Sequence, residues 1–395
     1  MKWSQMLVFF GIVFLVYGLI NFYIIKRGLD VIPAQYKTIF LVVIVFFVLS
    51  YIAGRFLERA FPSFISTILI WIGSFWIAFM FYFFLSIIVI DLFRLVNHFL
   101  PFFPPFMIKD PLKVKRTVAL SVVVLVFITV AGGFINARNI VVQNYKIYID
   151  KKAGNLKSLN IAMASDIHLG TILGKSFMEK VTDKINALHP DIILLAGDII
   201  DEDITPVLND NMGDALLKLK SRFGTYAITG NHEYIGGVEA ACNYLSEHGI
   251  KMLRDSVAEI DSAFYIIGRE DRSEKQFAHK QRKNLKDLLE GVNKSLPLIL
   301  MDHQPFGLQD AKENGIDLQL SGHTHNGQLW PLNYLISKIY ELGWGHMIIG
   351  KTHYYVSCGV GGWGPPIRTG SRPEIVNIKL IFKGRIENKS GKGKK

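Results

Sequence analysis

The chain has 395 residues, of which 50% are hydrophobic, and a formal net charge of +11. The first part of the chain, residues 1–116, contains eleven of the 44 Lys and Arg residues but only four of the 33 Asp and Glu residues. This part therefore carries +7 of the net charge. The remainder has no basic stripe with interleaved aromatic residues, which disfavours a nucleic-acid partner, and two distant cysteines say little about the redox compartment.

The first part of the chain contains four long stretches that are almost free of charged residues. They cover about 6–25, 38–54, 64–90 and 117–137. Crossing a bilayer takes about 20 apolar residues, and these stretches have no polar face, so we predict transmembrane helices rather than a soluble helical core. The first stretch is too long for the apolar core of a signal peptide and lacks a small-residue cleavage site. Residues 1–138 are therefore predicted to form a transmembrane anchor.

No Asp, Glu, Lys or Arg residue lies well inside these stretches. Ion and proton pathways usually need such groups, so the sequence favours an anchor over a transporter. After the third stretch, the segment 92–107 is rich in Phe and contains Pro101, Pro104 and Pro105, which prevent a long helix. We expect this segment to lie at the level of the lipid headgroups.

Basic residues are concentrated in two loops of the predicted anchor. The loops after the first and third stretches carry Lys26, Arg27, Lys37, Arg94, Lys109, Lys113, Lys115 and Arg116, whereas the opposite side offers Lys2, Arg55, Arg59 and Arg138. Loops rich in Lys and Arg remain in the cytoplasm, so this count predicts a multi-pass cell-membrane protein whose second part lies outside the cytoplasm. The basic loops also fit contact with anionic lipid headgroups.

Residues 139–155 are predicted to form a linker, and residues 156–383 to form one domain. In that domain, apolar strand-like runs alternate with helical patterns, which is typical of a layered α/β domain. Short runs that lie close together between residues 252 and 267 indicate that part of the sheet is antiparallel. The basic residues 384–395 form a polar tail that is predicted to be disordered.

Five blocks of polar residues in the second part follow apolar runs that are typical of buried strands. They are Asp166-Ile167-His168, Gly197-Asp198, Gly230-Asn231-His232-Glu233, His303, and Gly322-His323-Thr324-His325. Each block alone could be an ordinary turn or a helix cap, but the five together place carboxylate, imidazole and amide groups at one edge of a sheet. This mixture suits Mn²⁺, Fe or Zn²⁺, and the number of ligand groups fits two ions that share one carboxylate.

The blocks resemble the signature of the calcineurin-like metallophosphoesterase superfamily over residues 156–382. The resemblance implies three roles: Asp166, His168 and His325 bind one ion, Asn231, His303 and His323 bind the other, and Asp198 bridges the two. It also implies an α/β four-layer sandwich, in which helices flank two mixed sheets, preceded here by the four-helix transmembrane region. The implied cofactors are two divalent metal ions, with Mn²⁺ preferred over Fe or Zn²⁺.

Two further residues acquire roles from this resemblance. His232 matches a histidine that binds the phosphoryl oxygen or protonates the leaving group, and Asp201 matches a carboxylate that orients this histidine. A solvated acid within the acidic run 201–203 is the alternative for Asp201. Neither Cys242 nor Cys358 has a matching base nearby, so we expect a hydroxide activated by the metals, rather than a thiol, to attack phosphorus.

A narrower resemblance points to the membrane-associated YkuE/YaeI-type branch of the superfamily. It rests on Gly-Asn-His-Glu-Tyr, Gly-His-Thr-His-x-Gly-Gln and the Gly- and Pro-rich segment 361–368. That segment must be a loop, which could bring Trp363 and Arg368 to the mouth of the site, with Arg368 as a phosphate clamp. The alternative for Arg368 is a surface arginine on a turn. The chain departs from the branch at 268–271, where Gly-Arg-Glu-Asp replaces Gly-x-Asp-Asp, which puts a substrate role of this turn in doubt.

An apolar insertion between Gly327 and Gly350 begins beside His323 and His325. Its spacing predicts a helix packed on its own core or, alternatively, an apolar lip that accepts an acyl chain. With the anchor and the basic loops, the lip favours hydrolysis of a phosphodiester, phosphomonoester or pyrophosphate bond in a lipid-linked substrate. The alternatives are a UDP-diacylglucosamine-type pyrophosphohydrolase with a cytoplasmic domain, and a non-catalytic membrane scaffold with a vestigial phosphatase domain. The oligomeric state stays open.

Overall fold

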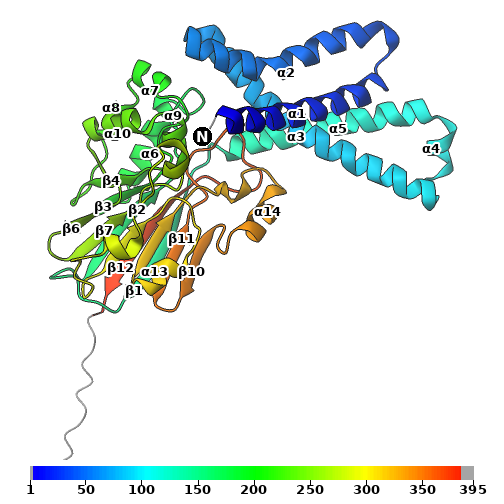
Figure 1. Cartoon of the computed structure of the whole chain (residues 1–395). Coiled ribbons are helices and arrows are strands. Elements are labelled where there is room, and N and C mark those ends of the chain that lie inside the picture. Colours follow the sequence, from blue (N-terminus) through cyan, green and yellow to red (C-terminus); the bar gives the residue numbers. More distant parts are fainter. Residues whose placement is uncertain (1–2, 384–395) are drawn as a thin grey trace, which may run out of the picture. The chain divides into compact units, whose positions relative to one another are not determined.

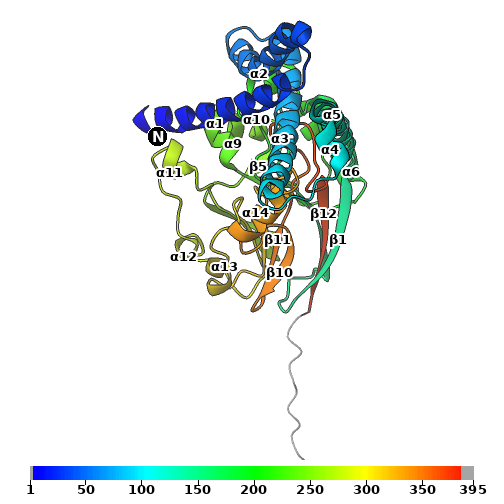
Figure 2. The ribbon, with the colours of Figure 1, turned by 90° about the vertical axis from the view of Figure 1, so that its right-hand side faces the viewer.

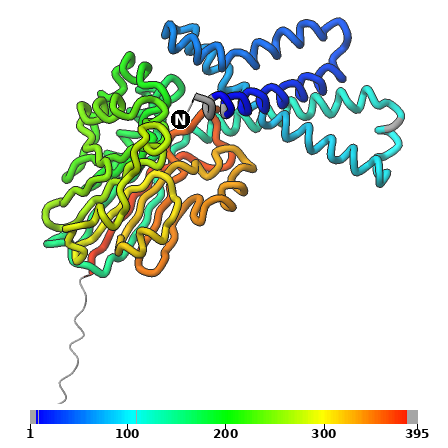
Figure 3. The backbone as a smooth tube through the Cα atoms, in the orientation of Figure 1, coloured from blue at the N-terminus to red at the C-terminus, as the bar shows by residue number. Residues whose placement is uncertain are grey.

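The computed structural model describes residues 3–383, so the predicted disordered tail 384–395 lies outside the described residues. Internal contacts divide the chain into two compact units (Figures 1 and 3). We call Met1–Asn136 together with Gly364–Thr369 the helical unit, and Ala137–Trp363 together with Gly370–Lys395 the sheet unit.

Long apolar helices make up the helical unit. Its elements are α1 (Trp3–Leu29), η1 (Ala34–Tyr36), α2 (Lys37–Ala60), α3 (Phe64–Phe99), α4 (Pro105–Lys109) and α5 (Pro111–Asn136). In the described part of the chain, α1, α2, α3 and α5 are long and apolar enough to cross a membrane. A buried polar pair joins α1 to α3, because the Trp76 indole donates a hydrogen bond of 3.0 Å to the side-chain carbonyl of Asn21.

The third helix is longer than the sequence predicts. It runs to Phe99 instead of ending near residue 90, so the predicted headgroup-level segment 92–107 is divided between the end of α3 and the short α4. No proline interrupts the helix before Pro101. Asp91, at the predicted end, is held in the helix by hydrogen bonds from Tyr23 and Arg27 of α1.

Two mixed six-stranded sheets form the sheet unit (Figure 1). The first has the order β1 (Val141–Ile149), β12 (Glu374–Phe382), β2 (Ser158–Ala164), β3 (Ile192–Ala196), β4 (Thr225–Ile228) and β5 (Ile250–Met252). The second has the order β10 (Gly345–Ile349), β11 (Thr352–Val356), β9 (Leu318–Ser321), β8 (Leu298–Met301), β7 (Phe264–Gly268) and β6 (Ser256–Ile260). Strands β2 to β5 are mutually parallel, as are β7, β8, β9 and β11, so their carboxyl ends share one edge of each sheet.

Alternation along the strands builds a separate core on each side of a sheet. In β2, Ile161 and Met163 pack between the two sheets, whereas Ala162 and Ala164 pack under helices on the outer face. The outer helices of the first sheet include α6 (Lys175–Asn186), α7 (Thr205–Asn209), α8 (Gly213–Leu216) and α10 (Val238–Glu247), and those of the second include α12 (Leu285–Leu288) and α13 (Gln309–Glu313). The predicted arrangement of two mixed sheets flanked by helices is confirmed.

The predicted linker 139–155 requires a correction, because most of it is strand β1. This strand pairs in parallel with β12 from Val141 opposite Glu374 to Ile149 opposite Phe382, and Figure 2 shows it at the edge of the sheet. Ile147 and Ile149 are buried in the core between the sheets. The strand is hard to recognise because polar residues occupy the positions that an edge strand exposes.

Candidate metal centre

The polar blocks lie where parallel strands of the two sheets end. In the first sheet, β2 leads into Asp166 and His168, β3 into Asp198, and β4 into Asn231. In the second sheet, β8 leads into His303, and β9 leads into His323 and His325. The loop after β2 and the loop after β3 stay paired, since the amides of Asp166 and His168 donate to the carbonyls of Gly197 and Asp198. Ligand-type side chains from five strands therefore converge at one place.

The backbone at this place is unusual. Asp166 (φ 53°), His168 (φ 52°), Asp198 (φ 52°), His323 (φ 71°) and His325 (φ 48°) all adopt the left-handed region, which is costly for residues other than glycine. Such conformations persist where the surrounding structure imposes them, and they concentrate at functional sites. The sharp turns aim successive side chains into the same space.

The first cluster of ligand atoms comprises Asp166, His168 and His325. The Nε2 atoms of His168 and His325 lie 3.2 Å apart, and His325 Nε2 lies 3.5 Å from Asp166 Oδ1. Both Asp166 and His168 are buried. This is the set that the sequence assigns to one metal ion.

The second cluster comprises Asp198, His303 and His323. His303 Nε2 lies 3.1 Å from Asp198 Oδ2, and His323 Nδ1 lies 2.8 Å from Asn231 Oδ1. Asp198 Oδ2 is also 3.9 Å from His168 Nε2, so this carboxylate stands between the two clusters. The structure thus brings all seven predicted ligands together, with Asp198 in the position expected of a bridge.

Unpartnered atoms test whether these residues fit bound cations. Within residues 3–383, Asp166 Oδ2 is buried with no hydrogen-bond partner, His168 Nδ1 stands 3.7 Å from Asp201 Oδ1, and His303 Nε2 has only the Asp198 carboxylate beside it, at 3.1 Å. A buried polar atom without a partner costs about 1–3 kcal/mol. Coordination by divalent cations would engage carboxylate oxygens and imidazole nitrogens of this kind, and the mixed donor set suits transition-metal ions. The residues therefore fit a pair of divalent metals.

Electrostatics keep the central carboxylate ionised. Burial disfavours the charged form of Asp198, but the neighbouring His303, His232 and His168 outweigh it and hold the pKa of this carboxyl well below its usual range. Burial disfavours the charged form of His303, but the neighbouring Asp198 carboxylate favours it more strongly. The pKa of His303 therefore lies well above its usual value. A permanently anionic Asp198 is what a bridging ligand requires.

His232 and Asp201 form a hydrogen-bonded pair beside the clusters. His232 Nδ1 lies 3.0 Å from Asp201 Oδ1, and the rings of His232 and His168 have centroids 4.5 Å apart. Burial opposes the charged form of His232, yet Asp198 and the hydrogen bond to Asp201 outweigh it and raise the pKa of His232 to about 9. Because Nδ1 faces Asp201, the other nitrogen, Nε2, is the one that a ligand can meet, and it has no hydrogen-bond partner in the described part of the chain.

Two glycines of the motifs leave room for these ligands. A Cβ atom at Gly230 would overlap Asp198 Oδ1, and a Cβ atom at Gly322 would overlap Asp166 Oδ2. Each glycine therefore permits a ligand from another strand end to approach its backbone closely. The motif glycines and the ligands are parts of one packed arrangement.

Glu233 is a residue of the site that the sequence interpretation missed. Its buried carboxylate accepts hydrogen bonds from four backbone amides: Asp198 at 3.1 Å, Ile199 at 2.7 Å, Ile200 at 2.9 Å and Gly230 at 2.7 Å. It thereby ties the loop after β3 to the first turn of α9 (Asn231–Gly236). The only signal for this role in the sequence is its place at the end of the Gly-Asn-His-Glu block.

We expect Glu233→Gln to destabilise the sheet unit. A glutamine amide can accept at one oxygen only, so at least one pair of backbone amides would face an NH₂ group and lose its acceptor. The expected loss is about 2–4 kcal/mol, or a fall in melting temperature of roughly 5–15 °C in detergent. The matched control is Glu247→Gln on the exposed end of α10, which should change stability by less than about 0.5 kcal/mol. Equal melting temperatures for the two variants would contradict the role given to Glu233.

The structure places the two predicted substrate-binding residues in different units. The Trp363 ring lies 6.4 Å from that of His232, and Gln328 fixes the Trp363 backbone, donating to its carbonyl at 2.9 Å and accepting from its amide at 3.1 Å. Arg368 belongs to the helical unit, where its amide donates to the carbonyl of Gly133 and its carbonyl accepts from the side chain of Asn136. Trp363 thus lies beside the metal centre, whereas the phosphate clamp at Arg368 stays a prediction.

The turn that departs from the branch pattern is occupied by internal ion pairs. Glu270 accepts from Thr229 at 2.8 Å and from Arg254 at 2.9 Å, and Arg269 donates to Asp302 at 3.3 Å and to Asp310 at 3.0 Å. These contacts give the turn a role in holding strand ends together.

The fold and the site combine two mixed sheets with a candidate metal centre at the ends of their parallel strands. Residues 159–327 match the family model of the calcineurin-like phosphoesterases. An uncharacterized metallophosphoesterase of Aquifex aeolicus is 32% identical, and the alignment covers 62% of this chain and 92% of that protein. The uncharacterized metallophosphoesterase YkoQ of Bacillus subtilis is 33% identical, and the alignment covers 66% of this chain and 97% of that protein. The chain belongs to the calcineurin-like metallophosphoesterases, a family of metal-dependent phosphoester hydrolases, as the motifs predict. The narrower YkuE/YaeI-type branch stays a prediction.

Longer relatives match over part of their length. The alignment covers 65% of an uncharacterized metallophosphoesterase of Helicobacter pylori, which is 33% identical over 62% of this chain. It covers 63% of a transmembrane protein with metallophosphoesterase domain from Danio rerio, which is 30% identical over 67% of this chain. The chain therefore spans slightly less than two thirds of these relatives.

Proposed function

We propose that this protein is a membrane-anchored phosphoesterase that uses two divalent metal ions to hydrolyse a phosphodiester, phosphomonoester or pyrophosphate bond. The observation that carries the proposal is the convergence of seven ligand-type side chains on two adjacent clusters, with Asp198 of the second cluster 3.9 Å from His168 of the first. Every predicted ligand is retained, which argues against a vestigial scaffold. The experiment that tests the proposal is metal analysis coupled to a panel of phosphate esters.

Each residue of the site has a part in this chemistry. Asp166, His168 and His325 would hold one ion, Asn231, His303 and His323 the other, and Asp198 both. When bound, two such ions polarise phosphoryl oxygens and acidify a water molecule. We propose Mn²⁺ as the metal, with Fe or Zn²⁺ as alternatives, because hard oxygen donors accompany imidazole.

His232 is the residue proposed to act on the leaving group. Asp201 fixes its Nδ1, so Nε2 is left to the substrate and, when the ring is protonated, can donate a proton to the departing oxygen or a hydrogen bond to a phosphoryl oxygen. Asp201 would not contact the substrate; it would act through His232 as a positioning residue. Trp363 closes one side of this space and offers a ring to the substrate.

The insertion after the last ligand block supports a lipid-linked substrate. It contains α14 (Leu332–Ile339), and no residue of this helix is buried. Tyr334 is 62% exposed and Leu335 is 54% exposed, whereas the first residue after the helix, Tyr340, lies edge-on to His323 with ring centroids 6.3 Å apart. An apolar helix that is exposed beside a catalytic centre favours the lip over a helix packed on its own core.

We expect the double variant Tyr334→Ser, Leu335→Ser to lose activity selectively. With a lipid phosphoester in micelles, kcat/KM should fall about tenfold, the equivalent of roughly 1.4 kcal/mol of lost apolar contact. With p-nitrophenyl phosphate it should stay within about twofold, because this substrate is too short to reach the lip. The matched control is Leu208→Ser, Leu217→Ser on α7 and just after α8, where both side chains are also exposed. A wild-type enzyme that hydrolysed water-soluble nucleotides far better than lipid phosphates would refute the lipid-linked substrate.

We also propose that the sheet unit lies outside the cytoplasm of a multi-pass cell-membrane protein. Eight basic residues lie in or beside the loops after α1 and α3, against four on the other side, and such loops remain cytoplasmic. A phosphatase reporter fused after Phe382 should then be active and a fluorescent cytoplasmic reporter inactive. The reverse pattern would favour a pyrophosphohydrolase acting on nucleotide-activated lipid precursors.

A further inference from the structure

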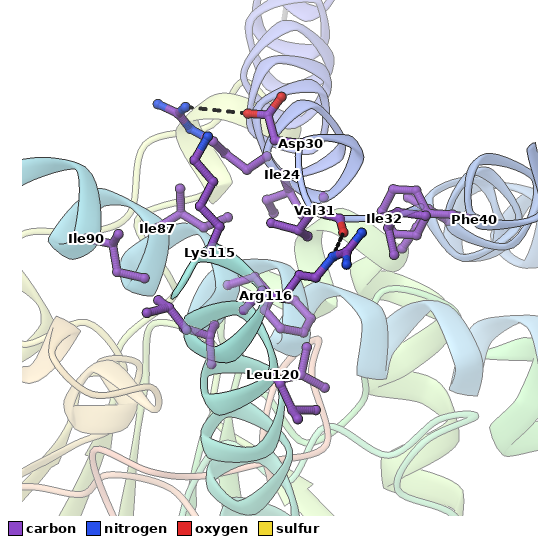
Figure 4. A pocket seen from close by; sticks show the side chains of 18 of the residues that line it. Ile24, Asp30, Val31, Ile32, Phe40, Ile87, Ile90, Lys115, Arg116 and Leu120 are labelled. Carbon is purple, nitrogen blue, oxygen red and sulfur yellow. Dashed lines mark hydrogen bonds and ion pairs between the residues drawn. The ribbon is translucent and has the colours of Figure 1, made fainter. Parts of the chain in front are cut away.

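The helical unit contains an apolar cavity of about 620 Å³ that the phosphoesterase chemistry does not use (Figure 4). It lies between the end of α1, the start of α2, the part of α3 from Trp76 to Arg94 and the first turns of α5. Its walls are largely hydrophobic and include Ile24, Ile44, Trp76, Phe83, Ile87 and Val122. A volume in the range of roughly 300–1,000 Å³ is typical of sites for small organic ligands.

One rim of this cavity is strongly basic. The charged residues that line it are Arg27, Arg94, Lys115 and Arg116, against Asp30 and Asp91. The four cations exceed the two anions by two positive charges. These cations stand beside apolar walls, at the ends of helices that are apolar enough to cross a membrane. They suit a negatively charged ligand that tolerates both environments.

The contacts show which cations remain available. Asp91 accepts from Tyr23 and Arg27 of α1 and from Arg94 at 3.2 Å, so its oxygens are occupied. Asp30 stands 3.8 Å from Arg27. Both acids are therefore already engaged by arginines.

Two cations on α5 lack an acid. Arg116 donates only to the backbone carbonyl of Val31, at 3.2 Å, and within residues 3–383 Lys115 forms no hydrogen bond or ion pair. Figure 4 shows both side chains rising from the first turns of α5 toward the loop that joins α1 to α2. In addition, Arg27 Nε is buried without a hydrogen-bond partner in the described chain. The buried Arg27 Nε and the exposed side chains of Lys115 and Arg116 thus offer three donors to an acceptor at one rim.

We propose that this cavity binds one anionic phospholipid, with an acyl chain against the apolar walls and the phosphate at Lys115 and Arg116. Basic pockets between membrane helices are suited to anionic headgroups, because the phosphate supplies the missing charge and the chain fills the apolar space. A free phosphate ion would leave the walls empty, and a zwitterionic lipid would bring a second cation to the rim. The site depends on the proposed membrane anchoring but not on the phosphoesterase activity.

The charge of the rim can be tested with the full-length protein in detergent. We would equilibrate it with equal amounts of phosphatidylglycerol and phosphatidylcholine and count retained lipids by native mass spectrometry. The wild type should prefer phosphatidylglycerol about tenfold or more, and Lys115→Gln, Arg116→Gln should abolish this preference. The matched control, Lys109→Gln, Lys113→Gln, removes two exposed cations that do not line the cavity and should keep it. Equal losses in both double variants, or none in either, would overturn the proposal.

The apolar part of the site needs a separate test. Val122→Trp fills the cavity, whereas Val124→Trp places the same side chain on α5 away from it. Only the first should lose the retained phosphatidylglycerol. Soluble glycerol phosphate at the same concentration should not displace the lipid; full displacement would mean an anion site without an acyl pocket and would refute the proposal. Extraction of the protein without detergent would instead refute the anchoring, so the two failures are distinguishable.

Discussion

Replacing Asp198 with asparagine is expected to remove metal binding and hydrolysis together. The substitution preserves the size of the side chain and the oxygen that accepts from the amide of His232 at 2.9 Å, so the local backbone can stay in place. It removes the single negative charge that lies between the two ligand clusters. We expect the metal content to fall from about two ions per chain and kcat/KM to fall by roughly 10³-fold or more, since the charge shared by two cations is lost.

The measurement combines metal analysis by atomic emission with the melting temperature in the presence and absence of chelator. Metal that binds only the folded chain stabilises it, by about 2.7 kcal/mol at a hundredfold excess over Kd, so chelation should lower the wild-type melting temperature. In Asp198→Asn, chelation should have no effect. An inactive variant that kept both metals and the chelator response would assign Asp198 a purely chemical role and contradict its place as a bridging ligand.

Replacing His232 with alanine is expected to separate metal binding from turnover. Its Nδ1 is committed to Asp201 and its ring stands beside the clusters, so metal content should stay at the wild-type level. Loss of a proton donor costs about 10²–10⁴-fold in rate, or roughly 3–5 kcal/mol of transition-state stabilisation. We expect a fall in kcat of this size for esters of alkyl alcohols.

The leaving group distinguishes the two roles open to His232. If the histidine protonates the departing oxygen, p-nitrophenyl esters should be affected much less than alkyl esters, because p-nitrophenolate departs without a proton. Equal losses for both would mean that His232 stabilises a phosphoryl oxygen instead. Asp201→Asn should reproduce the same leaving-group pattern at about a tenth of the effect, as a positioning residue would. Full turnover in His232→Ala would refute both roles.

Much of the site could be read from the amino-acid order. Asp166, Asp198 and His303 each follow a run of apolar residues, and a buried parallel strand must deliver the residue after it to the carboxyl edge of its sheet. The uncharged stretches likewise led directly to α1, α2, α3 and α5, because twenty apolar residues in a row leave no polar face to meet water. A run of apolar residues therefore predicts a buried strand or a membrane helix without knowledge of the rest of the fold.

Other features depend on partners that are distant in the chain. The linker proved to be β1 because β12, more than 200 residues later, offers it an edge, and Glu233 acquired its role only when four amides from two loops closed around it. The exposure of α14 and the grouping of Arg368 with the helices could not be inferred either, since periodicity does not say which surface a face will meet.

The sequence by itself therefore determined which chemical groups are present and which segments are apolar, because composition and spacing are local properties. Only the tertiary structure decided which backbone amides, charges and cavities those groups encounter, because such contacts join residues that the order of the chain leaves far apart.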